Sequence, residues 1–161
     1  MGILIMSISL VLFQPDIPQN TGTIIRLAAC LDVELHIIHP TGFPFSQKHL
    51  KRYGMDYIDF SVIKEHISFE AFEKWRKEKQ KRLVLLSTKA SVSIYHNKFS
   101  HDDILMMGRE SAGVPIDVAN CSDIKLRIPM NKEMRSLNIA VSAAMVLGEA
   151  KRQLGEFDDL V

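Results

Sequence analysis

The sequence predicts an α/β domain built on a mostly parallel β-sheet. Short apolar segments typical of strands alternate with segments whose apolar residues repeat at helical spacing. Residues 82–87, RLVLLS, form the nearly continuous apolar run expected of a strand that is covered on both faces. The 161 residues contain no repeat, linker or low-complexity tract, so we expect a single domain spanning residues 1–161.

In the first half of the chain, apolar strand segments frame two helical segments. The predicted elements are a strand, a helix, a strand, a short helix and a strand, at residues 7–13, 20–32, 34–39, 45–54 and 57–63. The opening MGILIMSISLVLF lacks a basic leader and is followed by QPDIPQN instead of a small-residue cleavage site. It therefore predicts a first strand and not a signal peptide.

The second half begins with an amphipathic helix at residues 68–80. This segment opens with Ser68 and carries Phe69, Phe72 and Trp75 on one helical face. Three strands and a last helix follow, at residues 82–87, 103–108, 123–129 and 137–154.

Composition excludes several classes of protein. Hydrophobic residues make up 47% and charged residues 24%, with a net charge of +1, as in a soluble globular protein. No apolar run approaches the ~20 residues that a membrane helix needs. Cys30 and Cys121 lie far apart without the spacing of metal ligands, so we expect reduced core thiols in a cytoplasmic protein.

Several familiar kinds of site are also absent. No G-x-G-x-x-G follows the first strand, and no G-x-x-x-x-G-K-[ST] occurs, so the usual nucleotide phosphate loops are missing. His36 and His39 are three residues apart on a predicted strand and point to opposite faces, which makes them poor joint metal ligands. No G-x-S-x-G elbow exists, and no base is identifiable for Ser111. What remains is a set of polar groups without a metal or a nucleophile.

Three predicted strands end in conspicuous polar loops, at residues 86–89, 108–111 and 128–131. In parallel sheets, ligands bind beyond the carboxyl ends of the strands. The three loops would lie at the same edge of the sheet, which predicts one site there.

Individual polar residues in these regions also have simple structural explanations. Asn20, Ser136 and Asn138 are suitable helix-capping residues. Arg26 suits the surface of an amphipathic helix, and Glu110 suits a solvated loop. The joint pattern, and no single residue, therefore carries the functional prediction.

Three blocks together resemble the motifs of a known family. NTGTIIRLAACLD, LMMGRESAGVP and LRIPMNKEMRSLNIAVSAAMVLGE are similar, in order, to the three motifs of the SPOUT superfamily of RNA methyltransferases. The short length and the opening LVLFQPDIPQNTGTIIRLAA resemble most closely its TrmL group of tRNA 2′-O-methyltransferases. The third block is the most specific, and the resemblance covers essentially the whole chain. Val114 stands where relatives often carry Leu, a change expected to affect packing and not chemistry.

The resemblance implies a fold and an activity. It implies an α/β-knot fold with a C-terminal deep trefoil knot, in a homodimer whose site is completed near the subunit interface. The implied reaction moves a methyl group from S-adenosyl-L-methionine to the 2′-hydroxyl of the tRNA wobble nucleotide (position 34, cytidine or modified uridine). The implied product is S-adenosyl-L-homocysteine. A metal and a membrane are not expected, and the partner is the anticodon region of tRNA.

Motif positions also imply site residues. The cofactor contacts are expected at Leu86, Ser87, Thr88, Gly108, Ile128, Met130, Ser136 and Leu137. The catalytic set is expected to be Arg26, Asn20, Glu110, Ser136 and Asn138. The residues expected to contact RNA phosphates are Lys48, Lys51, Arg52 and Arg135.

The role of Arg26 follows from the chemistry of its side chain. The 2′-hydroxyl is a weak nucleophile that needs a base or a polarising neighbour. A guanidinium, with a pKa above ~12, is a poor base. We therefore favour Arg26 fixing the adjacent phosphate and lowering the pKa of the hydroxyl, with deprotonated Arg26 as the alternative.

Two other functions stay open from the sequence. One is a 2′-O-methyltransferase acting on another tRNA or rRNA site. The other is a non-catalytic module that binds RNA and the cofactor.

Overall fold

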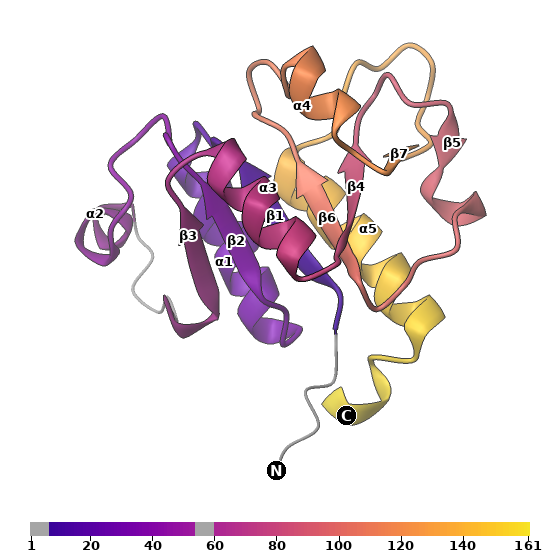
Figure 1. Ribbon diagram of the computed structural model, residues 1–161, viewed down its shortest axis with the longest axis horizontal. Helices are drawn as coiled ribbons and strands as arrows, with labels where there is room; N and C mark the ends of the chain where they lie inside the picture. The colour runs from indigo at the N-terminus through magenta and orange to yellow at the C-terminus, as the bar shows by residue number, and fades with distance from the viewer. Residues whose placement is uncertain (1–6, 54–59) are drawn as a thin grey trace.

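The computed structural model describes residues 7–53 and 60–161 and confirms the predicted α/β fold (Figure 1). Within these residues, seven strands form one sheet in the order β3-β2-β1-β6-β4-β7-β5, and every neighbouring pair is parallel. The strands are β1 (Ser9–Phe13), β2 (Leu35–Ile38), β3 (Ile63–His66), β4 (Arg82–Leu86), β5 (Val92–Ser93), β6 (Asp103–Met107) and β7 (Ile124–Arg127).

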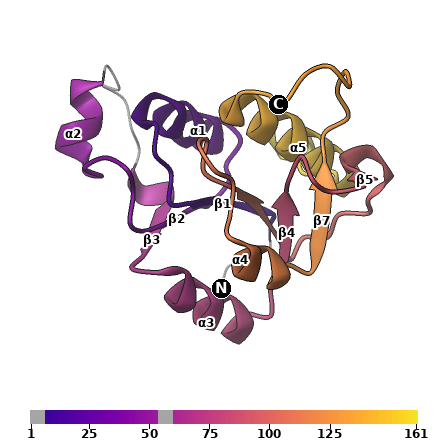
Figure 2. The same ribbon diagram turned by 90° about the horizontal axis from the view of Figure 1, so that it is seen from above.

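Helices cover both faces of this sheet (Figure 2). One face carries α1 (Pro18–Cys30) and α5 (Ile139–Leu154), and the other carries α3 (Phe69–Glu78) and α4 (Ile116–Asn120). The short helix α2 (Gln47–Arg52) lies beyond the edge of the sheet where β3 is the outermost strand. Short 3₁₀ turns occupy Phe60–Val62, Ile94–His96 and Asp158–Leu160. Each helix of the described residues is too short or too polar to cross a membrane.

Side chains alternate between two apolar layers, as the pattern of residues 82–87 predicted. Val84 packs in the layer under α1 and α5, whereas Leu83 and Leu85 pack in the layer under α3 and α4. All three are at most 2% exposed, because β4 lies inside the sheet with helices on both faces. Phe69, Phe72 and Trp75 of α3 share the second layer, which confirms the predicted amphipathic helix.

The path of the chain around β7 is unusual. β4 and β5 follow one another in sequence, yet β7 lies between them in the sheet. The chain reaches β7 from α4 on one face and continues into α5 on the other. β7 thus connects one face of the sheet to the other between two strands that are consecutive in sequence.

Several boundaries differ from the prediction. Helix α1 begins at Pro18, where a proline fits the first helical turn, and not at Asn20. Residues 60–62 form a 3₁₀ turn and the third strand occupies Ile63–His66, so the predicted strand at 57–63 was misplaced; residues 57–59 lie outside the described part. The short elements β5 and α4 were missed because segments of two and five residues carry no readable period.

The prediction for the two thiols was partly wrong. Cys30 and Cys121 are free, as expected, but both are exposed and neither belongs to the core. Helix α1 buries Ile24, Ile25 and Ala28, and Cys30 ends the helix on its solvent side.

Candidate functional site

A cavity of about 830 Å³ lies beyond the carboxyl ends of β4, β6 and β7. Its walls come from residues 85–90, 107–114 and 128–130, from the start of α5, and from Asn20 of α1. The three loops that the sequence placed at one edge thus do line one cavity. Its volume is within the ~300–1,000 Å³ of pockets that bind small molecules and cofactors.

Most of the expected site residues line this cavity. The eight expected cofactor contacts are all there, namely Leu86, Ser87, Thr88, Gly108, Ile128, Met130, Ser136 and Leu137. The expected catalytic residues that line it are Asn20, Glu110, Ser136 and Asn138. Lys89 and Arg109 line it too, within the predicted loops 86–89 and 108–111, whereas sequence reasoning missed Ile116 and Lys125.

A tight turn at residues 108–113 shapes one wall. The backbone N–H of Arg109 donates to the carbonyl of Gly113, and the N–H of Gly113 donates back, both at 2.9 Å. A Cβ on Gly108 would lie 2.9 Å from the Gly113 backbone, so only glycine allows this approach. Gly113 itself has φ +65, a conformation that also favours glycine. The turn brings Glu110 to the cavity.

Asn138 joins the first and third sequence blocks at the cavity. Its Oδ1 caps α5 by accepting from the N–H of Ala140 at 2.8 Å and of Val141 at 3.3 Å. This fixes the direction of the amide, and its Nδ2 donates to Asn20 Oδ1 at 3.0 Å. Because Asn20 does not cap α1, its side chain is available for this bond. The pair therefore has amide N–H donors left over at the cavity wall.

A cluster of charged and polar groups, centred on Asp16, contacts the 108–113 turn. The N–H of Asp16 donates to Glu110 Oε2 at 3.2 Å, and Ser111 Oγ donates to Asp16 Oδ2. Arg109 Nη2 lies 3.6 Å from Asp16 Oδ2. The sequence signal for Asp16 was its place in the loop that follows the carboxyl end of β1, but its contacts come from residues more than 90 positions away.

The two carboxyl groups of this cluster have opposite pKa shifts. The hydrogen bond from Glu110 lowers the pKa of Asp16, helped by the Ser111 hydroxyl and by the charge of Arg109. Burial raises the pKa of Glu110, and the hydrogen bond with Asp16 raises it further. Two like charges in contact repel, so the pKa of one carboxyl group rises while that of the other falls.

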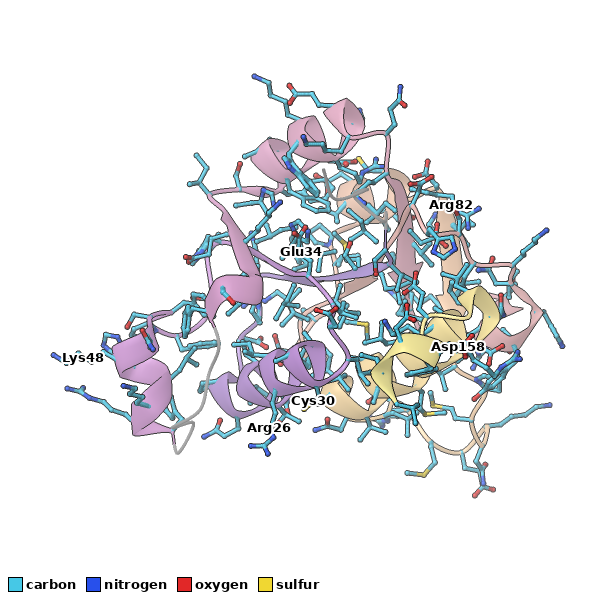
Figure 3. All side chains as sticks on the ribbon, turned by 90° about the horizontal axis from the view of Figure 1, so that it is seen from below. Arg26, Cys30, Glu34, Lys48, Arg82 and Asp158 are labelled. Atoms are coloured by element: carbon cyan, nitrogen blue, oxygen red, sulfur yellow. The ribbon has the colours of Figure 1, made fainter. Side chains whose placement is uncertain are left out.

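Arg26 and the expected RNA-binding residues lie outside the cavity lining. Arg26 is exposed on α1 and projects outward from the molecule (Figure 3). Lys48, Lys51 and Arg52 are exposed on α2, and Arg135 is exposed in the segment before α5.

The two histidines considered from sequence have separate partners. His36 is buried, with Nδ1 2.9 Å from His66 Nε2 and Nε2 2.9 Å from Glu34 Oε1. His39 Nε2 lies 2.8 Å from Glu65 Oε1. In residues 7–53 and 60–161, no three His, Cys, Asp or Glu residues gather in a group able to hold a metal ion.

Comparisons with known proteins point to one family. The model of a family described as the SpoU rRNA methylase family matches residues 7–148. A tRNA (cytidine(34)-2′-O)-methyltransferase of Beijerinckia indica subsp. indica is 58% identical over 146 residues, covering 91% of each chain. A protein of the same name from Escherichia coli strain K12 is 39% identical over 150 residues, covering 92% of this chain and 94% of the relative.

Two solved structures are also similar to this chain. A structure concerned with 2′-OH methylation of C/U34 on tRNA superposes with a TM-score of 0.85 at 40% identity, covering 92% of this chain and 97% of the other. An AdoMet-bound rRNA methyltransferase from Sinorhizobium meliloti has a TM-score of 0.78 at 28% identity, over 92% of this chain and 57% of that one.

Proposed function

Because the chain belongs to the SpoU rRNA methylase family, we propose that it methylates the ribose 2′-hydroxyl of the tRNA wobble nucleotide, position 34. The observation that carries this proposal is that three sequence blocks, distant in the chain, line one cavity. The chain is also 58% identical, over 91% of both lengths, to a relative named for this reaction.

The cavity suits S-adenosyl-L-methionine, which supplies an activated methyl group on its sulfonium. Leu86, Met107 and Ile128 give the cavity an apolar part that would take an adenine ring. Ser87, Thr88 and Ser136 add hydroxyl groups that would hold a ribose. The close approach of Gly108 to Gly113 leaves backbone near the cavity uncovered by side chains. We further propose that the chain around β7 forms the trefoil knot of the family, which keeps these loops fixed in position.

Asn20 and Asn138 would orient the acceptor ribose. Their shared hydrogen bond leaves amide N–H donors, which suit ribose or phosphate oxygens. Holding the hydroxyl in line with the methyl group accounts for a large part of such a displacement. Arg26 would bind the neighbouring phosphate and stabilise the alkoxide as it forms.

A homodimer would bring Arg26 to a cavity. Arg26 lies outside the lining of the cavity in its own chain, so a second copy is the natural route to a complete site. The outer side of α5 and the segment before it carry Leu137, Val141, Ala144 and Gly148 at helical spacing. Val141 is 49% exposed, and a Cβ added to Gly148 would meet nothing within 4 Å. We propose that this stripe packs against the same stripe of a second copy.

The anticodon arm would lie across the basic residues outside the cavity. Lys48, Lys51 and Arg52 of α2 and Arg135 are exposed cations suited to phosphate contacts. We expect the enzyme to work in the cytoplasm, where its tRNA substrates are.

Methylation of rRNA is the second candidate function. The matched family is described as an rRNA methylase family, and the S. meliloti structure is an rRNA methyltransferase. This chain covers only 57% of that protein, but it covers 91% of the relative from B. indica. The tRNA reaction is therefore favoured.

The test is methyl transfer from labelled S-adenosyl-L-methionine to unfractionated tRNA and, separately, to rRNA. We expect a 2′-O-methyl group at position 34 of tRNA, located by mass spectrometry. Arg26→Ala should lower the rate by about 100-fold or more, since it removes an electrostatic contact to the reacting region. Arg152→Ala, an exposed arginine near the end of α5, is the matched control and should keep full activity. Methylation of rRNA alone would refute the proposal.

A further inference from the structure

Asp16 contacts the catalytic region without lining the cavity. It lies in the loop between β1 and α1, and its carboxylate is largely buried. Ser111 Oγ donates to its Oδ2, Arg109 Nη2 lies 3.6 Å from that same oxygen, and its own N–H donates to Glu110 Oε2 at 3.2 Å. Asp16 therefore touches three consecutive residues of the 108–113 turn.

Asp16 also packs against the loop at residues 40–43. The N–H of Gly42 donates to the carbonyl of Pro15 at 2.9 Å. A Cβ placed on Gly42 would lie 2.7 Å from Asp16 Cβ and 2.9 Å from its Cα. Asp16 is thus packed between the 40–43 loop and the 108–113 turn, with no room to withdraw from the turn.

The Asp16 side chain lacks one hydrogen-bond donor. Its Oδ1 is buried, and among the described residues no group donates a hydrogen bond to it. A hydrogen bond between the carboxyl groups of Asp16 and Glu110 lowers the pKa of the first and raises that of the second, and such a bond requires a proton on one of the two. A proton on the Glu110 carboxyl group would supply such a donor, and Asp16 would then remain the charged partner of Arg109 and Ser111.

We propose that Asp16 is a positioning residue for the methyl-transfer site, and that one proton shared with Glu110 holds the 108–113 turn against the cofactor cavity. This inference rests on the proposed function, because it assigns the turn to the cofactor. In the part of the chain that the structure describes, the charged group in contact with these two carboxyl groups is Arg109. When the shared proton leaves, two adjacent carboxylates repel, and the turn should move away from its binding position.

The raised pKa of Glu110 gives the direction of the pH effect. The site is intact while the pair holds its proton and loosens as pH rises through the pKa of Glu110. Asp16→Asn removes this dependence, because the amide oxygen still accepts from Ser111 while the amide nitrogen donates permanently to the Glu110 carboxylate. Asp16→Ala removes both interactions at every pH.

The experiment measures the affinity for S-adenosyl-L-homocysteine by calorimetry from about pH 5.5 to about pH 9. This range begins above the ordinary pKa of a glutamate side chain. We expect the wild-type affinity to fall as pH rises, the Asp16→Asn affinity to stay level, and Asp16→Ala to bind about tenfold more weakly throughout. Asp159→Asn, an exposed carboxylate on the C-terminal 3₁₀ turn, is the matched control and should follow the wild type.

Two results would overturn the inference. One is an Asp16→Ala protein that binds as tightly as the wild type. The other is an Asp16→Asn protein with the wild-type pH dependence, because a merely structural role would weaken binding without changing its pH profile. Urea unfolding of each variant checks that loss of affinity is not loss of fold. The binding comparison uses no tRNA, so failure of the wild type to methylate position 34 would refute the proposed substrate separately.

Discussion

The Asn138 side chain uses its two ends differently. Its oxygen accepts two backbone N–H groups at the start of α5, and its nitrogen donates to Asn20 at 3.0 Å. The first contact belongs to helix stability and the second to the site. Because one amide group does both, a cap that stabilises the helix also fixes the direction of a polar group at the cavity.

Substitutions at Asn138 should separate these two contributions. Asn138→Asp keeps the capping oxygen and adds a negative charge at a helix N-terminus, so the free energy of unfolding should stay close to that of the wild type. It cannot donate to Asn20, whose amide nitrogen would turn to the new carboxylate, and two donors would be lost from the cavity. We expect methyl transfer to fall by about 100-fold in this variant.

Asn138→Ala provides the comparison. It should lower the free energy of unfolding by about 1 kcal/mol, since it removes the cap, and it should lower activity as well. Urea unfolding and single-turnover methyl transfer measure the two effects. If Asn138→Asp kept full activity, the bond to Asn20 would have no catalytic role.

At the scale of elements, β2, β3 and α3 meet at two histidines, of which His36 is buried and His66 is partly buried. His36 of β2 stacks on His66 of β3, and both rings contact Trp75 of α3. Burial lowers the pKa of His66 to about 4, and the contact with His36 lowers the pKa of Glu34 to about 2. Burial also lowers the pKa of His36, so both imidazoles are neutral near pH 7. His66 Nε2–H donates to His36 Nδ1, and His36 Nε2–H faces Glu34.

The lowered pKa values of His66 and Glu34 predict that the fold loses stability as pH falls. Between pH 6.5 and about 4, the unfolded chain binds a proton at His66 that the folded state excludes, so the free energy of unfolding falls as pH falls. Above pH 4.5, the lowered pKa of Glu34 stabilises the folded state. This stabilisation is lost as pH falls from 4.5 to about 2, where Glu34 binds a proton in the folded state as well.

His66→Gln should flatten the upper part of this dependence. Urea midpoints measured from pH 7 to pH 4 would show a shallower decline for this variant than for the wild type. His96→Gln, at an exposed histidine of the Ile94–His96 turn, is the control and should leave the decline unchanged. Equal slopes for all three proteins would show that the acid sensitivity has another source.

At the scale of the whole molecule, we expect the outer stripe of α5 to complete the site by binding a second copy of the chain. The stripe of Leu137, Val141, Ala144 and Gly148 begins at Leu137, which lines the cavity next to Asn138, and runs along the outside of the helix. A second copy packed on it would lie next to the cavity. Assembly and catalysis are then linked through one helix.

Ala144→Glu should break this assembly. A carboxylate buried in an apolar interface costs several kcal/mol, so the variant is expected to be a folded monomer by analytical ultracentrifugation. Its methyl transfer should fall together with the dimer fraction, because Arg26 would no longer reach a cavity. Ile67→Glu, at an isoleucine that is 85% exposed elsewhere, is the control and should stay dimeric. A dimeric Ala144→Glu protein would place the interface on another surface.

The sequence by itself determined the layered α/β class and the edge of the sheet that carries the site. The nearly continuous apolar run at residues 82–87 required cover on both faces, and the loops after three parallel strands had to meet at one edge. These features depend on local periodicity and on the direction of parallel strands, both of which are written in short stretches of the chain. The resemblance then added the residues expected to bind the cofactor, and these residues line the cavity.

Tertiary structure alone decided the contacts between distant segments. Asn138 meets Asn20 across 118 positions, and Ser111 meets Asp16 across 95. The insertion of β7 between β4 and β5 brings loops together in an order that no local pattern shows. The exposure of Cys30 was likewise set by which side of α1 packs on the sheet. Such features depend on non-local packing, because the same polar residues would be ordinary caps and surface groups if the chain took another path.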